Sequence, residues 1–284
     1  MTRIVFLNGD YLPADQARIS IFDRAVNFGD AIYEVAGVMD GKLVDFEHHM
    51  QRYFDSLAKL GIEPPLEQQQ ILDAFRKLVD LNSLDEGLVY MQVTRGVAER
   101  DFVWPDDIVP TVFMFTQPKT SAENEAAETG VTLASTADIR WARRDIKSTN
   151  LLAQVLAKKA AHDAGAYEAL MIDADGYVTE CGSTSFFIVR DDIILTRPLN
   201  DEILPGVTRR AVITLCTTHG LRLVESKFTL NEALDADEAF ISGASSYVLP
   251  VVSIDDREIG GGKPGELTRR LRQIYIDHAR ATLT

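Results

Sequence analysis

Apolar residues along the chain follow two patterns, one typical of strands and one typical of helices. Short runs rich in β-branched and aromatic residues, bounded by turn residues, predict strands. These runs cover residues 4–7, 32–39, 43–46, 88–94, 111–116, 131–134, 169–172, 177–179, 185–189, 193–196 and 238–241. Apolar residues that recur every three or four positions predict helices over residues 46–60, 66–81, 151–164, 208–218 and 266–282.

Three two-residue turn sequences, Asn8-Gly9, Asp40-Gly41 and Asp175-Gly176, lie next to predicted strands. Each favours a type I′ hairpin turn, which needs a positive φ at both central residues. Hairpins join antiparallel strands, whereas a doubly wound parallel sheet needs helical crossovers. The pattern therefore predicts the α+β class.

A polar segment without periodicity, residues 117–125, is the best candidate for a linker. It divides the chain into predicted domains at residues 1–119 and 120–284. Both parts are long enough to bury a hydrophobic core of their own.

Composition excludes several classes of protein. The chain has 284 residues, 46% of them hydrophobic, and 29 basic against 43 acidic residues give a net charge of −14. A disordered chain and a disulfide scaffold are excluded, and the acidic balance argues against a nucleic-acid partner.

No apolar run approaches the ~18 residues that cross a bilayer, so no membrane partner is expected. Cys181 and Cys216 show no metal-ligand spacing, which predicts no metal site and reduced thiols in a cytoplasmic protein.

Four segments contain residues that could carry chemistry. Lys147 lies between a strand-like run and an Ala-rich helix, although spacing alone favours an ordinary solvated lysine at this position. Glu180 stands beside small hydroxyl residues after a strand, which could also be a locally capped turn. The helix that opens near Thr208 offers backbone N–H groups to an anion, or simply begins with an ordinary N-cap. Residues 242–246 form a small-residue turn that could complete a phosphate site or be only a loop.

Seven short motifs, taken in order and with their separations, resemble the fold-type IV enzymes that use pyridoxal 5′-phosphate, most closely the D-amino acid transaminases. They are Phe28-Gly-Asp-Ala-Ile-Tyr-Glu-Val35, Asp40-Gly41, His49-x-x-Arg52, Gln92-Val-Thr-Arg-Gly96, Asp145-Ile-Lys-Ser-Thr-Asn-Leu-Leu152, Val178-Thr-Glu180 and Leu204-x-Gly-x-Thr-Arg209. The resemblance covers nearly the whole chain. It implies a small N-terminal α/β domain, a larger C-terminal barrel-like domain that carries the cofactor lysine, and the cofactor between them.

The same resemblance implies a role for each matching residue around the cofactor. Lys147 matches the Schiff-base lysine, which also carries the proton between the substrate and the cofactor. Glu180 matches the carboxylate that faces the pyridine nitrogen, and Arg52 matches the arginine that binds the phosphate. The other matches are Val207 and Thr208 at a helix N-terminus, Gly243 and Ala244 in a second phosphate turn, and Ser183 and Thr184 beside the ring. Ala244 lacks the hydroxyl that relatives often carry there.

Two further matches bear on substrate recognition. Tyr33 and Arg100 match positions that hold the substrate α-carboxylate, and Val35 follows Tyr33 on the same strand; the Arg100 loop would come from the partner subunit. Relatives often read Arg-x-His, whereas this chain reads Arg100-Asp101-Phe102. Phe102 therefore removes one donor to the carboxylate and could admit (R)-amines, which have no carboxylate.

The resemblance implies transamination between a D-amino acid, such as D-alanine or D-glutamate, and a 2-oxo acid, such as pyruvate or 2-oxoglutarate. A branched-chain L-amino acid transaminase, an (R)-amine transaminase and a 4-amino-4-deoxychorismate lyase remain alternatives, because they share the cofactor residues. The implied partners are the small-molecule amino donor and acceptor, together with a second copy of the chain in a homodimer.

Overall fold

The computed structural model describes residues 2–284, and these residues form two compact units. The first unit contains residues 2–120 together with Ile146–Asn150 and Thr282–Thr284. The second contains Ser121–Asp145 and Leu151–Ala281. The division after Thr120 lies next to the predicted domain boundary, whereas the segment that carries Lys147 groups with the first unit.

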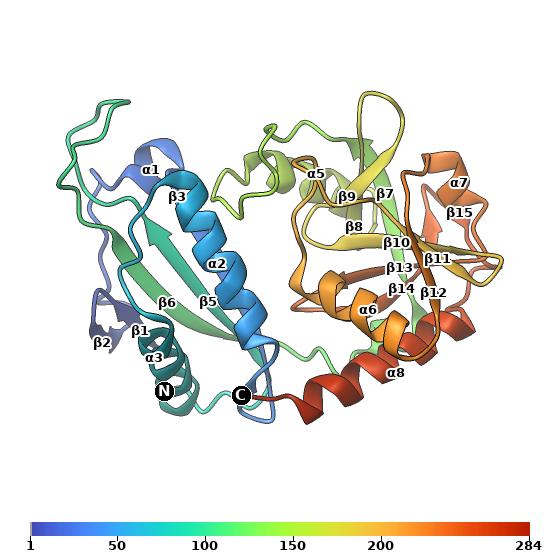
Figure 1. Ribbon diagram of the computed structural model, residues 1–284, viewed down its shortest axis with the longest axis horizontal. Coiled ribbons are helices and arrows are strands. Elements are labelled where there is room, and N and C mark those ends of the chain that lie inside the picture. The colour runs from blue at the N-terminus through green and yellow to red at the C-terminus, as the bar shows by residue number, and fades with distance from the viewer. Residues whose placement is uncertain (1) are drawn as a thin grey trace. The chain divides into compact units, whose positions relative to one another are not determined.

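The first unit is built on one antiparallel sheet of six strands (Figure 1). In spatial order the strands are β2 (Asp10–Pro13), β1 (Ile4–Leu7), β6 (Thr111–Pro118), β5 (Gly87–Thr94), β3 (Ala31–Met39) and β4 (Lys42–Leu43). Its helices are α1 (Arg24–Phe28), α2 (Phe46–Leu60) and α3 (Gln68–Leu81).

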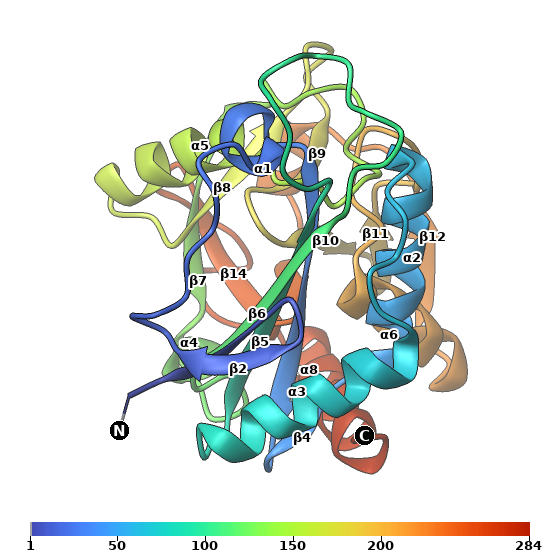
Figure 2. The same cartoon turned by 90° about the vertical axis from the view of Figure 1, so that its left-hand side faces the viewer.

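Helices α2 and α3 cover one face of this sheet (Figures 1 and 2). Alternate residues of β3 point into the core, among them Ile32, Ala36 and Val38, and they pack with apolar residues of both helices. The period of two along a strand places the residues between them, Tyr33 and Val35, on the opposite face. Those two side chains are only half-buried, so the predicted substrate residues lie on the face without helices.

The second unit contains a mixed sheet of nine strands. Eight form a continuous order, which is β12 (Arg222–Glu225), β11 (Ile193–Thr196), β10 (Ser185–Arg190), β13 (Glu238–Gly243), β14 (Tyr247–Ile254), β7 (Val131–Ala137), β8 (Glu168–Ile172) and β9 (Val178–Cys181), and β15 (Arg257–Glu258) pairs with β14. The helices are α4 (Glu125–Thr129), α5 (Leu152–Asp163), α6 (Val207–Thr218), α7 (Leu230–Leu234) and α8 (Glu266–Ala281).

Inward residues of this second sheet, such as Phe186, Ile188 and Ile241, pack into the core of the second unit with the apolar side of α7. Helix α8 packs on β13 and β14, and α5 packs on β7 and β8. Antiparallel pairs dominate the first sheet, and helices and strands occur in similar measure, so the predicted α+β class is confirmed.

Most predicted elements form within a few residues of the expected ends, but two local predictions are wrong. Residues 43–46 were expected to be one strand, yet pairing stops at Leu43 and Phe46 begins α2, because Asp45 adopts a φ of 53° and turns the chain. Asn8-Gly9 and Asp40-Gly41 have positive φ at both residues, as type I′ turns require. In the third turn only Gly176 has positive φ, and its N–H donates to the Asp173 carbonyl, as in a type I turn followed by a bulge.

Candidate functional site

Lys147 lies in the first unit, beside the start of β3. Ser148 forms an antiparallel bridge with Ile32, and the N–H of Tyr33 donates to the Lys147 carbonyl at 2.9 Å. The half-buried Lys147 side chain places Nζ 4.1 Å from the centroid of the Tyr33 ring. Backbone pairing therefore brings two predicted site residues together.

An aromatic stack extends from Tyr33 across the helix-free face of the sheet. The Tyr33 and Tyr90 rings stack at 5.6 Å between centroids, and Phe113 and Phe115 stack on Tyr90 at 6.2 and 4.7 Å. Burial raises the pKa of Tyr90 above its usual range, and its hydroxyl donates to Gln92 at 2.7 Å. Val35 pairs directly with Tyr90 across the strands, so the neighbourhood of Lys147 is a wall of stacked rings and one valine.

Arg52 lies on the buried side of α2, where it pairs with Glu34 of β3. Its Nε donates to Oε1 of Glu34 at 2.7 Å and its Nη2 to Oε2 at 2.8 Å. His49 Nδ1 lies 2.8 Å from the same Oε2. All three side chains are buried, and Glu34 has no exposed surface. The fork geometry of this pair fixes the orientation of the Arg52 guanidinium.

The charge of Glu34 depends on these two neighbours. Burial alone would raise the pKa of the Glu34 carboxyl, but Arg52 and His49 overcome burial and hold that pKa well below its usual range. Glu34 is therefore ionised at neutral pH and keeps the guanidinium paired.

The loop 97–110, between β5 and β6, carries Arg100 and Phe102. Asp30 accepts from Nε of both Arg24 and Arg95 at 2.8 Å, and these two buried arginines hold the loop. Arg24 donates to the carbonyls of Asp101 and Phe102 at 2.6 and 3.2 Å. The loop backbone is thus positioned by ionic contacts at its base.

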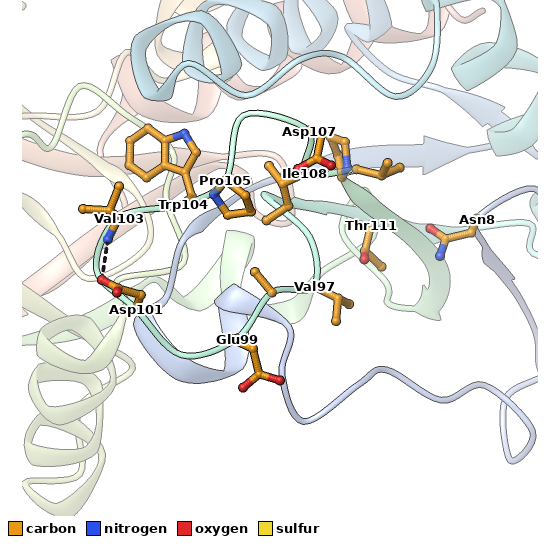
Figure 3. A pocket seen from close by; sticks show the side chains of 13 residues that line it. Asn8, Val97, Glu99, Asp101, Val103, Trp104, Pro105, Asp107, Ile108 and Thr111 are labelled. Carbon is orange, nitrogen blue, oxygen red and sulfur yellow. Dashed lines mark hydrogen bonds between the residues drawn. The ribbon is translucent and has the colours of Figure 1, made fainter.

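The side chains of Arg100 and Phe102 meet at the ring of Phe28. The Arg100 guanidinium lies 5.2 Å and the Phe102 ring 5.5 Å from the Phe28 centroid. Both side chains are nevertheless exposed, Phe102 by 76%. The same loop curves around an open pocket of about 910 Å³, with Pro105 and Ile108 on its inner side (Figure 3).

Glu180 lies in the second unit, near the end of β9, and its side chain is buried. Its Oε1 accepts from Nη1 of Arg140 and from the N–H of Leu204, the latter at 3.1 Å. Burial raises the pKa of Glu180 above its usual range, although Arg140 opposes this effect. The loop 197–206, which contains Leu204, leads into α6 and thereby connects Glu180 to that helix.

The turn after Glu180 contains Ser183 and Thr184. Ser183 is exposed, but its hydroxyl donates to Glu168 at 2.7 Å and accepts from Lys158 at 2.8 Å. Glu168 is buried and also accepts from Lys158 at 2.7 Å. The predicted ring-side hydroxyl of Ser183 is therefore used to fasten the turn to β8 and α5.

Small residues from four segments gather next to this turn and form what we call the hydroxyl cradle: Thr184, Ser185, Gly206, Ser242, Gly243 and Ser246. A Cβ on Gly206 would lie 2.8 Å from Ser185 Oγ, and one on Gly243 would lie 3.0 Å from Thr184 Cγ2. Ser185 and Ser242 pair directly across β10 and β13, so their side chains share a face. Among residues 2–284, the buried Oγ atoms of Ser242 and Ser246 have no hydrogen-bond partner.

The N-terminus of α6 adjoins the hydroxyl cradle. Gly206 is its N-cap and supplies no side-chain cap, so the N–H groups of Val207 and Thr208 begin the helix. Gly243 ends β13 and Ala244 begins the turn that follows, and Arg272 of α8 braces this turn by donating to the Ser246 carbonyl at 3.1 Å. The structure therefore brings together the second group of predicted residues: Glu180, Ser183, Thr184, Val207, Thr208, Gly243 and Ala244.

Sequence reasoning missed the residues that support these side chains. Glu34 had a readable signal, because it is the only charged residue in a strand of otherwise apolar and aromatic residues. Glu168 had the same signal, because it is the only charged residue in β8. Arg140 and Asp138 had none, since they stand in a segment where charged and apolar residues alternate without a clear period. Only the fold shows which of these charges are buried.

Comparison with known proteins gives consistent matches. The family described as amino-transferase class IV matches residues 31–254. The D-alanine aminotransferase of Bacillus licheniformis is 38% identical over 268 residues, which is 94% of each chain. The D-alanine aminotransferase of Staphylococcus aureus strain MSSA476 is 36% identical over 272 residues, 95% of this chain and 96% of the relative.

Solved structures share the same fold. The T.th. branched-chain amino acid aminotransferase with pyridoxamine 5′-phosphate gives a TM-score of 0.92 at 25% identity, over 100% of this chain and 98% of that chain. The branched-chain amino acid aminotransferase of Escherichia coli gives a TM-score of 0.92 at 24% identity, over 98% and 95% of the two chains. The order of elements in both units is thus that of known enzymes.

Replacing the buried acid of the first unit tests its pairing with Arg52. We expect Glu34→Gln to lower the free energy of unfolding at pH 7 by about 3–5 kcal/mol, because a buried arginine loses its counter-charge. The pKa of Glu34 is lower in the folded than in the unfolded chain, so its stabilisation is present above the unfolded value of about 4.3 and is lost as the pH falls below it. Urea unfolding across a pH series measures both effects.

Glu47→Gln is the matched control, because Glu47 lies on the exposed side of the same helix. An exposed pair contributes little, about 0–1 kcal/mol. Equal losses in the two variants, or a Glu34→Gln effect that does not shrink in acid, would contradict the pairing.

Proposed function

Because the chain belongs to the class IV aminotransferases, we propose that it moves an amino group between a D-amino acid, such as D-alanine or D-glutamate, and a 2-oxo acid, such as pyruvate or 2-oxoglutarate. Similarity to D-alanine aminotransferases over more than nine-tenths of the chain is the observation that carries this proposal. Class IV aminotransferases use pyridoxal 5′-phosphate. When bound, this cofactor supplies an aldehyde that accepts the amino group and a ring that absorbs negative charge.

The hydroxyl cradle suits the phosphate of this cofactor. Two buried hydroxyls, of Ser242 and Ser246, lack partners within the described chain, and a phosphate oxygen would satisfy them. The N–H groups of Val207 and Thr208 at the start of α6 add donors of the kind that bind phosphates. Glycines at 206 and 243 leave the space that a Cβ would fill. Ala244 adds only backbone to this turn.

Arg52 is our candidate for the cationic phosphate ligand. Glu34 holds the guanidinium through Nε and Nη2, so the plane of the fork is fixed before any ligand arrives. A pre-oriented arginine loses little side-chain entropy when it binds an anion. Glu34 and His49 are then positioning residues for Arg52.

Lys147 and Glu180 are the proposed residues of the chemical step. Lys147 Nζ would bind the cofactor and move a proton to and from the substrate Cα, since a lysine in this role acts as both nucleophile and general base. Glu180 would face the ring nitrogen, where a carboxylate favours the protonated form of that nitrogen. Ser183 and Thr184 would line the ring, with Ser183 held by Glu168.

Tyr33, Val35, Arg100 and Phe102 are the proposed substrate residues. The aromatic wall beside Lys147 offers an apolar surface to a side chain, and Arg100 offers a cation to the α-carboxylate. Phe102 is apolar and 76% exposed where relatives often have a histidine. This observation favours (R)-amines as a second class of donor, because they need no carboxylate ligand.

Exposed apolar side chains gather where the segment 19–26 meets the loop 97–110. The two segments join through the Asp23–Val97 bridge and a hydrogen bond from Ala98 N–H to the Phe22 carbonyl. The patch comprises Ile19, Ile21, Phe22, Val26, Val97, Phe102, Val103, Trp104 and Val109. A patch of this kind marks an interaction site. A second copy of the chain would cover it in a homodimer and place Arg100 at the neighbouring active site.

A cytoplasmic location also belongs to this proposal. Cys181 and Cys216 are buried free thiols, which suits a reducing compartment. Across residues 2–284, every helix is too short or too polar to cross a bilayer.

Removal of the proposed cofactor lysine tests the chemistry. We expect Lys147→Ala to lower the rate of amino transfer from D-alanine to 2-oxoglutarate by at least about 100-fold, because no other amine replaces the lost nucleophile and base. The visible absorbance of the purified protein should change at the same time. Lys159→Ala, at an exposed position on α5, is the control and should keep its activity. Full turnover in Lys147→Ala would end the proposal.

Truncation of Arg100 tests carboxylate recognition. We expect Arg100→Ala to raise KM for D-alanine about tenfold or more, since a hydrogen bond to a charged group contributes ~1.5–3 kcal/mol. The KM for an (R)-amine without a carboxylate should change little. Steady-state kinetics with both donors, and with Glu99→Ala as a control in the same loop, give the comparison. An equal change for both donors would remove Arg100 from this role.

Subunit mixing tests whether the Arg100 loop serves the neighbouring site. Equal amounts of Lys147→Ala and Arg100→Ala proteins are allowed to exchange subunits. Each mixed dimer then regains one site with both residues intact, so with D-alanine well below its wild-type KM, where Arg100→Ala sites contribute little, about a quarter of wild-type activity should return. Mixing Lys147→Ala with the double variant is the control, because no intact site can form. Absence of recovery in the first mixture would show that each chain uses its own loop.

A further inference from the structure

Glu180 is a buried carboxylate whose two protein donors share one oxygen. Arg140 Nη1 and the Leu204 N–H both donate to Oε1. Within residues 2–284, no donor lies at hydrogen-bond distance from Oε2. Oε2 is not among the fully buried unpaired side-chain atoms of the described residues, so it keeps some exposed surface and can accept a hydrogen bond from outside the protein. The arrangement therefore leaves Oε2 open to a ligand while Oε1 is held by the protein.

Arg140 is held in place from its other side. Asp138, whose side chain is fully buried, accepts from Nε of Arg140 at 2.9 Å and from Nη2 at 2.7 Å. Thr179 Oγ1 donates to Asp138 at 2.7 Å, and Arg144 lies 3.4 Å from it. The guanidinium therefore spans two carboxylates and cannot turn away from Glu180 without breaking a bidentate pair.

Besides holding Glu180 in place, Arg140 also influences the protonation of the Glu180 carboxyl. Burial raises the pKa of Glu180, Arg140 lowers it, and the negative charge of Asp138 raises it. Burial would lower the pKa of the Arg140 guanidinium, but Asp138 and Glu180 outweigh burial and raise it above its usual range. Within the second unit the titratable neighbours of Glu180 are Arg140, Asp138 and Cys181. Arg140 is the cation among them, so the ionised form of Glu180 depends on it.

We propose that Arg140, clamped by Asp138, is a positioning residue that holds the Glu180 carboxylate and directs its Oε2 toward the ring nitrogen of pyridoxal 5′-phosphate. This inference rests on the proposed function, in which Glu180 is the partner of that nitrogen. Without Arg140, a buried Glu180 takes up a proton more readily and its free oxygen loses a fixed direction. The ring nitrogen then loses an anionic partner.

A purely structural role for Arg140 would have a different signature. As a tie between the loop after β7 and strand β9, Arg140 would matter equally whether or not residue 180 carries a charge. A positioning role makes the effect of Arg140 depend on Glu180. Non-additivity of neighbouring substitutions separates the two roles.

The test is a double-substitution cycle read as the dissociation constant of pyridoxal 5′-phosphate. The variants are Arg140→Met, Glu180→Gln and the two combined. We expect Arg140→Met to weaken cofactor binding roughly tenfold, and to have almost no further effect when Glu180→Gln is already present. Equal losses in both backgrounds would overturn the proposal. Arg143→Met is the matched control, because the exposed Arg143 pairs with Asp145 and not with Glu180, and should leave binding unchanged.

A second readout needs no cofactor. In the cofactor-free chain, the carboxyl carbon signal of Glu180 is assigned by its loss in Glu180→Gln and followed against pH by NMR. Arg140→Met should raise the pKa of Glu180, and Arg143→Met should not. An unchanged titration would overturn the proposal even if transamination is confirmed. Conversely, a chain without transaminase activity would refute the proposed function while this titration still reports on Arg140.

Arg140→Lys is included in case Arg140→Met does not fold. Lysine keeps the positive charge but not the fork, so its dissociation constant and its Glu180 titration should lie between those of the wild type and Arg140→Met. A lysine variant that behaves like Arg140→Met in both measurements would assign the effect to packing alone.

Discussion

Buried carboxylates that each fix an arginine set the geometry of this protein. Glu34 fixes Arg52 in the first unit, and Asp138 fixes Arg140 in the second. A charge without water is costly unless it is paired and hydrogen-bonded, so each pair admits few orientations. Asp30, which is partly buried, acts in a similar way, because it pairs with two arginines and through Arg24 holds the backbone of the loop 97–110. In the proposed site, the groups that would meet a ligand are therefore oriented by two carboxylates, Glu34 and Asp138, that would not touch it themselves.

The fold was readable from sequence where a local rule decides it. Helices with a clear apolar stripe, such as α2 and α3, begin and end close to the predicted residues. Turns rich in glycine were also readable, whereas two turns made by Asp191-Asp192 and Asp255-Asp256 were missed, although both residues of each have positive φ. Aspartate tolerates this conformation but occurs in many others. Its presence alone therefore does not predict a turn.

For the candidate site, only residues that lie in recognisable motifs could be predicted from the sequence. Lys147, Glu180 and Arg52 stand in short patterns that resemble a known family, so a residue could be matched to a role. Glu34 and His49 also stand inside these patterns, but the supporting residues of the second unit, Asp138, Arg140 and Glu168, do not. Glu168, for example, begins β8 and contacts Ser183 of a turn 15 residues away, and only the fold brings them together. Pairing between distant charges is a tertiary property, and one sequence holds no local trace of it.

The separation between anchoring and recognition has a consequence for specificity. Arg24 holds the carbonyl groups of Asp101 and Phe102, not their side chains. A different side chain at position 102 therefore alters the exposed surface of this loop while the backbone keeps its anchors. The same holds in the second unit, where backbone N–H groups of α6 and glycines at 206 and 243 build the hydroxyl cradle. Substrate preference in such a scaffold can change by single side chains on the loop, because the cofactor residues depend on a different set of contacts.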